Sequence, residues 1–266
     1  MNSEASPSTA KTNSTPAEAP AKGAVLDYWN KEEVESMYDK HLLNAEISLV
    51  KSWIPRDAKL LDAGCGEGEG TLEYSRAAAT VHAADFSATR LRKAEQLVGN
   101  APNVQFRQVD FRQDYTLDSD YDVVVTQRFL INLMEWKEQQ RVITRLIGSL
   151  KPGGRLLMLE GSQPGVDELN RFRAACGLPP IPVRWHNRFF DDQEVQQFVA
   201  ESGWKLRAVQ GLGGYFLLTR GVRPLLDSNL NWDCEFNRIA ASSGLGELGA
   251  FDPVRFSRLK LWVVER

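Results

Sequence analysis

The stretch that decides the fold is Leu60-Leu61-Asp62-Ala63-Gly64-Cys65-Gly66-Glu67-Gly68. An apolar run enters a turn with glycine at every second position, and a segment with helical character follows. Glycine lets the main chain adopt left-handed conformations, and it lets a ligand approach the backbone N–H groups closely. The pattern predicts a strand, a ligand-binding turn and a helix, in that order.

The glycine spacing differs from two common nucleotide motifs. A dinucleotide fingerprint G-x-G-x-x-G would need glycine at 69 or at 71, where the chain has Glu69 and Thr71. The Walker pattern that ends in Gly-Lys-Ser/Thr is also absent from the sequence. A nicotinamide dehydrogenase is therefore a distant alternative, and a plain structural corner is a second alternative for the turn taken alone.

Short apolar segments alternate with longer amphipathic segments on both sides of the turn. We predict strands at 59–63, 80–85, 104–110, 121–126, 154–160, 204–209 and 258–264. We predict helices at 25–50, 70–78, 88–98, 137–150 and 191–202. This alternation is typical of an α/β fold with a mostly parallel sheet and helices on both faces.

The rest of the chain divides into a tail, one domain and two insertions. Residues 1–24 are rich in Ala, Ser, Thr and Pro, so they are predicted to form a disordered tail. Residues 25–266 are predicted to form a single domain. The segments 161–190 and 211–257 are too long for simple loops, and we expect them to form a helical lid over the substrate.

Composition excludes several classes of protein. The chain has 266 residues, 42% hydrophobic and 25% charged, with a net charge of −3, so it offers no basic surface for nucleic acid. Its three cysteines lack CxxC spacing, which argues against a disulfide framework and a metal site. No apolar run approaches the roughly 20 residues of a membrane span, and the N-terminus lacks signal-peptide features. We expect a cytoplasmic protein without a membrane partner.

Acidic residues follow two of the predicted strands. Asp85 ends the second strand about 20 residues after the glycine turn, where a carboxylate can accept hydrogen bonds from ribose hydroxyls. Asp110 ends the third predicted strand. Helix caps explain either residue alone, but with the glycine turn the two aspartates mark one crevice at the carboxyl edge of a sheet.

Together these motifs resemble class I S-adenosylmethionine-dependent methyltransferases. The segments that carry the resemblance are Leu61–Gly68, Ala84–Ser87, Val109–Phe111 and Leu150–Leu156. It extends over residues 25–266 and implies a Rossmann-like sheet of seven strands in the order 3-2-1-4-5-7-6, with the seventh strand antiparallel. It also implies S-adenosylmethionine as cofactor.

The resemblance assigns four residues to the methionine end of the cofactor. Gly64 and Gly66 would pass under the methionine part, with Asp62 near its amino group. Gln127, just after the fourth strand, would lie near the methionyl portion.

Four further residues are assigned to the nucleoside end. Asp85 would bind the ribose hydroxyls and Phe86 would pack on the adenine. Asp110 would accept a hydrogen bond from the adenine amino group, beside Phe111. Relatives often have methionine where this chain has Arg90, so two alternatives stay open for it: a packing contact with the adenine or ribose, or a solvated helix residue.

Candidates for catalysis follow the fourth and fifth strands or lie in the first insertion. Arg128 could orient a carboxylate or phosphate, or it could form a salt bridge with Glu160. Glu160 could be a base or only hold Arg128. His186, in Trp185-His186-Asn187, titrates near neutrality and could deprotonate a hydroxyl, although a structural histidine is the commoner outcome. Aromatic residues of the first helix, including Trp29, are assigned to the core.

Two subclasses of methyltransferase are disfavoured. The Asp/Asn-Pro-Pro-Tyr motif of amine and amide methyltransferases is missing, and Thr126 stands where metal-dependent catechol-type enzymes have aspartate. We therefore expect O-methylation of a small polar acceptor, at a hydroxyl or carboxylate of a natural product or sugar. The alternatives are N- or C-methylation of a small molecule, and a module that binds S-adenosylmethionine without turnover.

Overall fold

The computed structural model describes residues 23–35, 37–116, 118–227, 229, 231–242 and 252–266. The tail predicted for residues 1–24 therefore falls outside the described residues except for its last two positions. Residues 243–251 of the second insertion are also outside them.

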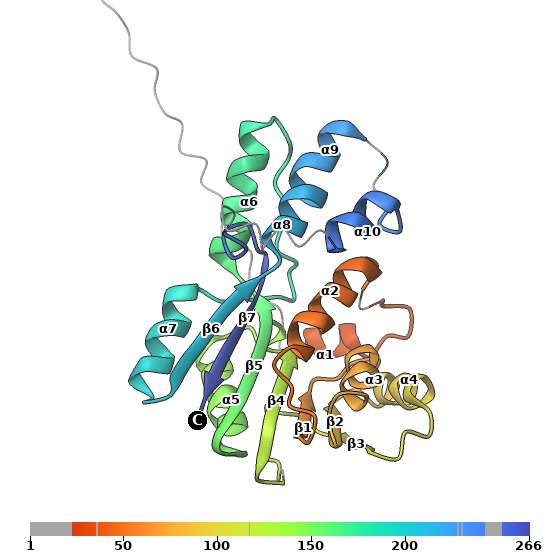
Figure 1. The fold of residues 1–266 in the computed structure, drawn as a ribbon, viewed down its shortest axis with the longest axis vertical. Coiled ribbons are helices and arrows are strands. Elements are labelled where there is room, and N and C mark those ends of the chain that lie inside the picture. The colour runs from red at the N-terminus through yellow and green to blue at the C-terminus, as the bar shows by residue number, and fades with distance from the viewer. Residues whose placement is uncertain (1–22, 36, 117, 228, 230, 243–251) are drawn as a thin grey trace, which may run out of the picture.

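One sheet of seven strands forms the centre of the molecule (Figure 1). The strands are β1 (Lys59–Ala63), β2 (Thr80–Asp85), β3 (Val104–Gln108), β4 (Tyr121–Gln127), β5 (Leu150–Gly161), β6 (Lys205–Gly211) and β7 (Leu259–Glu265). Their order is β3-β2-β1-β4-β5-β7-β6. β7 runs antiparallel to both neighbours, and the other pairings are parallel. The fold expected from the resemblance is confirmed.

Helices cover both faces of the sheet. They are α1 (Ala24–Trp29), α2 (Lys40–Lys51), α3 (Glu69–Ser75), α4 (Ala88–Val98), α5 (Trp136–Gly148), α6 (Gln163–Ala175), α7 (Asp192–Glu201), α8 (Gly213–Phe216), α9 (Arg223–Leu226) and α10 (Glu235–Ser242). A 3₁₀ turn, η1 (Leu130–Asn132), follows β4, and a π-helix, η2 (Leu217–Val222), links α8 to α9.

The single helix predicted for residues 25–50 is wrong, because the chain is interrupted between α1 and α2. The guanidinium of Arg90 donates to the carbonyls of Trp29 and Val34, which holds this segment against α4. Asp39 then starts a new helix, since its carboxylate accepts a hydrogen bond from the N–H of Leu42 as an N-cap.

The core lies on both faces because side chains alternate along each strand. Leu60 of β1 packs on the face covered by α2 and α3, whereas Leu61 packs on the face covered by α5 and α7. Tyr215 and Phe216 of α8 belong to the same apolar cluster as Leu60. The second insertion therefore shares a core with the sheet.

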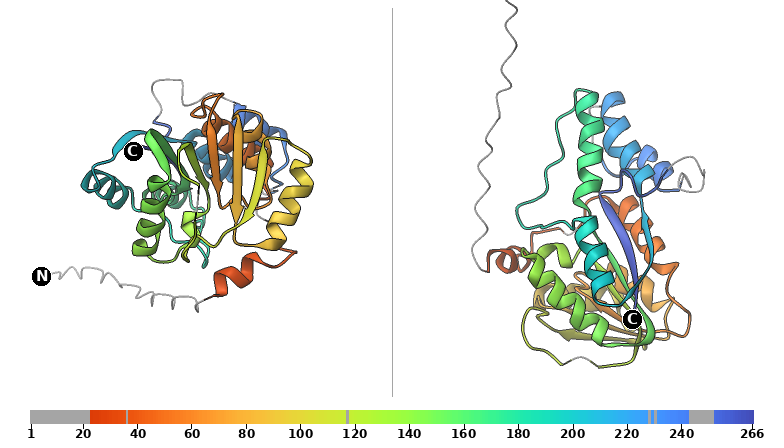
Figure 2. Two further views of the ribbon diagram at one scale, coloured as in Figure 1. Left: turned by 90° about the horizontal axis from the view of Figure 1, so that it is seen from below. Right: turned by 90° about the vertical axis from the view of Figure 1, so that its left-hand side faces the viewer.

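The insertion helices, defined as α6, α8, η2, α9 and α10, gather beyond the carboxyl ends of the parallel strands (Figures 1 and 2). α6 belongs to the insertion predicted at 161–190, and the others belong to the one predicted at 211–257. A site at the carboxyl edge of the sheet is thus bordered by the glycine turn on one side and by insertion helices on the other. None of the helices in the described part of the chain has the length and apolar character that crossing a bilayer requires.

Candidate active site

The glycine turn connects β1 to α3 in an open, left-handed conformation. Gly64, Gly66 and Gly68 have φ of 77°, 55° and 86°, a region that favours glycine. A Cβ on Gly64 would lie 2.5 Å from the Cβ of Phe129, so Phe129 can pack directly on the turn. A Cβ on Gly66 would meet no described atom within 4 Å, which leaves this part of the main chain open to a ligand.

Two buried carboxylates lie next to this turn. One oxygen of Asp85 accepts from the N–H of Gly66 (3.0 Å) and the other from the N–H of Ser87 (2.9 Å). Asp62 accepts from the hydroxyl of Thr71 (2.6 Å). Burial raises the pKa of Asp85, and burial with the nearby Asp85 charge raises the pKa of Asp62 to about 7. A cation that entered here would be stabilised.

Asp110 follows β3 and is paired with a cation. Arg112 donates to both of its carboxylate oxygens, at 2.9 and 2.7 Å, which lowers the pKa of Asp110. Phe111 lies next to Phe129, with ring centroids 5.3 Å apart. The two rings form an apolar wall between Asp110 and the end of β4.

A buried network fixes the end of β4. Tyr74 donates to the side-chain oxygen of Gln127 (2.8 Å), and the Gln127 amide donates to Glu46 (3.0 Å). Glu46 is fully buried and receives a bidentate pair from Arg128. Arg128 has φ of 55°, a strained value for a residue with a side chain, and such strain concentrates at functional sites.

Arg128 forms a salt bridge, as one of its two alternatives expected, but the partner is Glu46 and not Glu160. Glu160 is fully buried, and its carboxylate accepts hydrogen bonds from the N–H groups of Phe129, Leu130 and Ile131 at 3.1 to 3.3 Å. Glu160 therefore holds the segment that follows β4 in place. It is not among the residues that line the cavity described below.

His186 lies under aromatic rings of α1. Its ring stacks on Tyr28 with centroids 4.4 Å apart and meets Trp29 edge-on at 5.4 Å. Its Nδ1 is buried and has no hydrogen-bond partner among the described residues. Burial and the nearby Arg184 lower the pKa of His186 to about 4, so the imidazole is neutral at physiological pH.

α1 closes one side of the site and is fixed by two contacts. Trp29 Nε1 donates to Asn132 Oδ1 (2.9 Å), and Arg90 donates to the carbonyl of Trp29 (3.1 Å) while pairing with Glu67. The interpretation of Arg90 as a solvated residue is wrong, since it is 2% exposed. Trp29 also lines the cavity, beyond the core role assigned to it from the sequence.

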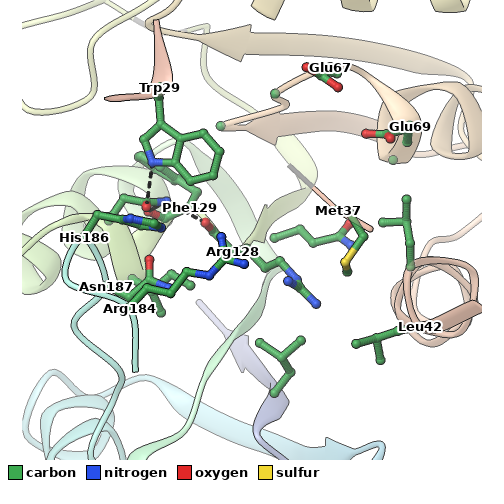
Figure 3. A pocket seen from close by; sticks show the side chains of 18 of the residues that line it. Trp29, Met37, Leu42, Glu67, Glu69, Arg128, Phe129, Arg184, His186 and Asn187 are labelled. Carbon is green, nitrogen blue, oxygen red and sulfur yellow. Dashed lines mark hydrogen bonds between the residues drawn. The ribbon is translucent and has the colours of Figure 1, made fainter. Parts of the chain in front are cut away.

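These parts enclose one cavity of about 470 Å³. All eight predicted cofactor-binding residues line it, together with Arg128 and His186. Figure 3 shows Glu67 and Glu69 of the glycine turn at one side, and Arg128, Arg184, His186 and Asn187 gathered at another. The cavity therefore runs from the glycine turn to the insertions.

The fold and this cavity define the class of protein as class I S-adenosylmethionine-dependent methyltransferases. A protein-family profile described as "Methyltransferase domain" matches residues 60–154. The ubiquinone/menaquinone biosynthesis C-methyltransferase UbiE of Stutzerimonas stutzeri is 30% identical over 190 residues, which cover 62% of this chain and 73% of that protein. The UbiE of Azotobacter vinelandii is 27% identical over 210 residues, 69% of this chain and 81% of that protein.

The chain belongs to the UbiE-like family of class I S-adenosylmethionine-dependent methyltransferases. Among solved structures, magnesium protoporphyrin IX methyltransferase from Synechocystis PCC 6803 matches with a TM-score of 0.56 at 15% identity, over 93% of this chain and 95% of that chain. A methyltransferase structure from Listeria monocytogenes matches with a TM-score of 0.56 at 14% identity, over 84% and 99%. At such identities these likenesses concern the fold. The protein is a methyltransferase that uses S-adenosylmethionine and acts on a small molecule.

Sequence reasoning missed several residues of the site. Glu46 had a signal, because it is a lone acid on the apolar face of α2 beside Leu42, Leu43 and Ile47. No sequence signal pointed to Arg220 and Arg258, because they come from distant parts of the chain and meet only in the folded cavity.

Proposed function

We propose that this protein transfers the methyl group of S-adenosylmethionine to an oxygen of a small polar acceptor. The observation that supports the proposal is the continuity of the cavity, which joins the glycine turn to His186 and to the insertion helices. A cofactor at the turn and an acceptor at the insertions would share one enclosed space, as a direct transfer requires.

The cofactor half of the cavity fits S-adenosylmethionine by its chemistry. The open main chain at Gly66 accommodates the methionine part, and the carboxylate of Asp62 suits an ammonium group. Asp85 would receive the ribose hydroxyls, and Asp110 with Phe111 would border the adenine. Bound there, the sulfonium supplies the methyl electrophile.

The same assignment places two other residues beside the nucleoside and the methionyl portion. Phe86 would pack on the adenine, and Gln127 would lie near the methionyl portion with its amide oriented by Tyr74 and Glu46. Gly64 would pass under the methionine part, where Phe129 covers the turn.

In the acceptor half we assign the general base to His186. Its imidazole is neutral, and in the tautomer protonated at Nε2 the buried Nδ1 would carry a lone pair that no described residue uses. The pKa of about 4 makes it a weak base, so it suits transfer of the proton from the hydroxyl as the O–CH₃ bond forms. Arg128, fixed by Glu46, would orient the acceptor.

C-methylation is the second candidate, because the curated relatives are described as C-methyltransferases. A carbon nucleophile that is already electron-rich would not need a base at His186. Binding without turnover is the third candidate.

One experiment separates these candidates. The protein is incubated with carbon-13 methyl-labelled S-adenosylmethionine and a small-molecule extract, and the labelled product is identified by NMR, which distinguishes methyl on oxygen from methyl on carbon or nitrogen. A methyl ether or ester supports the proposal, and a C-methyl product contradicts it. Cofactor binding without any labelled product from a broad panel of extracts favours the binding module.

A further inference from the structure

Five arginines from five separate segments of the chain line one end of the cavity. They are Arg128 after β4, Arg173 of α6, Arg184 before α7, Arg220 of η2 and Arg258 before β7. We call this group the arginine end. A π-helix such as η2 is a rare element found at functional sites, and here it carries Arg220 into the cavity.

Most of the acidic residues that line the cavity lie away from the arginine end. Asp62 of β1, Glu67 of the glycine turn, Glu69 of α3, Asp85 of β2 and Asp110 after β3 line the other end, where Arg90 pairs with Glu67 and Arg112 pairs with Asp110. At the arginine end only two carboxylates contact the five guanidinium groups within the described residues: Glu46 pairs with Arg128, and Asp39 pairs with Arg220. Five positive and two negative charges leave a net charge of +3.

Three of the five arginines, Arg173, Arg184 and Arg258, lack an anionic partner within ion-pair distance among the described residues. Among the described residues, no hydrogen bond or ion pair involves the side chains of Arg184 and Arg258. Arg258 lies over the ring of Phe189, at 5.4 Å, and the charge of Glu46 acts on it from beyond ion-pair distance. Arg173 donates only to main-chain carbonyls, those of Pro179 and Arg220. Arg184 is exposed, whereas Arg258 is partly buried and Arg173 is buried. Charge withdrawn from water without an anionic partner is costly, so Arg173 and Arg258 point to a missing counter-ion.

Repulsion among the arginines of the arginine end also indicates a missing counter-ion. Burial and the charges of Arg128, Arg220 and Arg184 lower the pKa of Arg258 to about 10. The cofactor cannot neutralise the group, since S-adenosylmethionine has one carboxylate against one ammonium and one sulfonium. Its binding adds a positive charge to the cavity.

We propose that the arginine end is an acceptor subsite for an anion, and that Arg184 and Arg258 bind a carboxylate or phosphate group of the methyl acceptor. Guanidinium groups bind such oxyanions through paired N–H···O bonds. The inference rests on the proposed function and narrows it, because the small polar acceptor becomes an acidic one.

The test is a calorimetric titration at constant ionic strength of protein saturated with S-adenosylhomocysteine. Inorganic phosphate and malonate serve as probes, and their relative affinities distinguish a phosphate group from a carboxylate. The variants are Arg184→Gln and Arg258→Gln, with Arg258→Lys to retain the charge. Arg92→Gln is the matched control, because it removes the same charge from α4 outside the cavity.

We expect wild-type protein and Arg92→Gln to bind at least one dianion equally well, and Arg184→Gln and Arg258→Gln to bind it at least tenfold more weakly. Arg258→Lys should bind with intermediate affinity, and thermal unfolding confirms that each variant is folded. Failure of both dianions to bind wild-type protein would overturn the subsite, as would unchanged affinity in both glutamine variants. A parallel loss of S-adenosylhomocysteine affinity in these variants would instead assign the arginines to the cofactor and overturn it.

The titration is repeated on protein without S-adenosylhomocysteine. Absence of S-adenosylhomocysteine binding by wild-type protein contradicts the proposed function, whereas absence of dianion binding contradicts only the subsite. The two failures are therefore distinguishable.

Discussion

At the scale of single residues, the buried carboxylates of the cavity differ in what compensates their charge. Glu46 and Asp39 each pair with an arginine. Asp62 has only the hydroxyl of Thr71, and its pKa is raised to about 7. Of these three acids, Asp62 is therefore the one whose ionised form most needs a positively charged ligand.

Cofactor affinity should follow the ionisation of Asp62. Without ligand, the carboxyl becomes protonated as the pH falls below about 7. A cofactor ammonium beside it requires the ionised form, so binding below this pH releases a proton. We expect the Kd of S-adenosylhomocysteine to rise by up to about tenfold for each pH unit below 7, and to change by only about twofold from pH 7 to 8. Calorimetry in buffers of different ionisation enthalpy measures both the Kd and the released proton.

Asp62→Asn is the control for this prediction. It preserves shape and cannot ionise, so its binding should be weaker at pH 8 and independent of pH. A wild-type Kd that does not change between pH 5.5 and 8 would show that no ammonium is bound beside Asp62.

The assignment of His186 as the general base leads to a second prediction. Because the pKa of His186 is about 4, the base form persists to low pH, and kcat should show no loss attributable to this group between pH 5.5 and 8. His186→Asn should lower kcat by about 100-fold or more while leaving the Kd of S-adenosylhomocysteine within threefold. Single-turnover methyl transfer measures the step directly. Wild-type turnover in His186→Asn across the pH range would exclude the base.

At the scale of elements, the segment after β4 is held by contacts from several parts of the fold. Glu160 of β5 accepts from three of its N–H groups, and Gln139 of α5 donates to the carbonyl of Leu130. Glu160→Ala should leave two buried N–H groups, those of Leu130 and Ile131, and the partly buried N–H of Phe129 without an acceptor, which costs about 2–6 kcal/mol. Urea unfolding of Glu160→Ala measures this change.

The variant Glu160→Gln tests whether Glu160 only positions the segment after β4 or also acts as a general base. Its side-chain oxygen still accepts hydrogen bonds, so this variant should lose less stability and keep kcat within about tenfold, a loss smaller than that caused by removal of a general base. If Glu160→Gln were inactive but as stable as the wild type, Glu160 would again be a candidate catalytic residue.

Helix α1 depends on one buried cation for its position. Arg90 binds the carbonyls of Trp29 and Val34 and pairs with Glu67. Arg90→Met should release α1 from α4, and dissociation of S-adenosylhomocysteine should accelerate about tenfold, a change of about 1.4 kcal/mol if association is unchanged. Stopped-flow displacement measures the rate. Arg92→Gln, on the same helix and exposed, should dissociate at the wild-type rate.

The sequence could predict those parts of the fold that local patterning determines. β1 and β2 have the predicted bounds, because in each case glycine or aspartate in the sequence shows where the apolar strand ends. The Arg128 partner could not be predicted, since Glu46 lies 82 positions away and the two meet only after α2 packs on the sheet. The break between α1 and α2 was missed for the same reason, because Arg90 lies 61 positions after Trp29.

At the scale of the whole molecule, the insertions are integrated with the sheet. Tyr215 of α8 packs in the cluster that contains Leu60 of β1, and its hydroxyl donates to Asp39 at the start of α2 (2.8 Å). Asp39 also pairs with Arg220 of η2. An insertion that shares both a core and a buried ion pair with the sheet cannot open fully without exposing apolar surface.

The described parts of the chain should therefore unfold together. Calorimetry should show one transition, with equal van't Hoff and calorimetric enthalpies, because the shared core links the insertions to the sheet. S-adenosylhomocysteine at 1,000 times its Kd should stabilise the protein by about 4 kcal/mol and raise the midpoint by roughly 10 °C as a single shifted peak. If the insertions were a separate unit, the scan would show two peaks, and the ligand would shift only the one that contains the glycine turn. Tyr215→Phe, which removes the hydrogen bond to Asp39, should lower the midpoint of the single peak without splitting it, whereas a split peak would show that this contact alone couples the two parts.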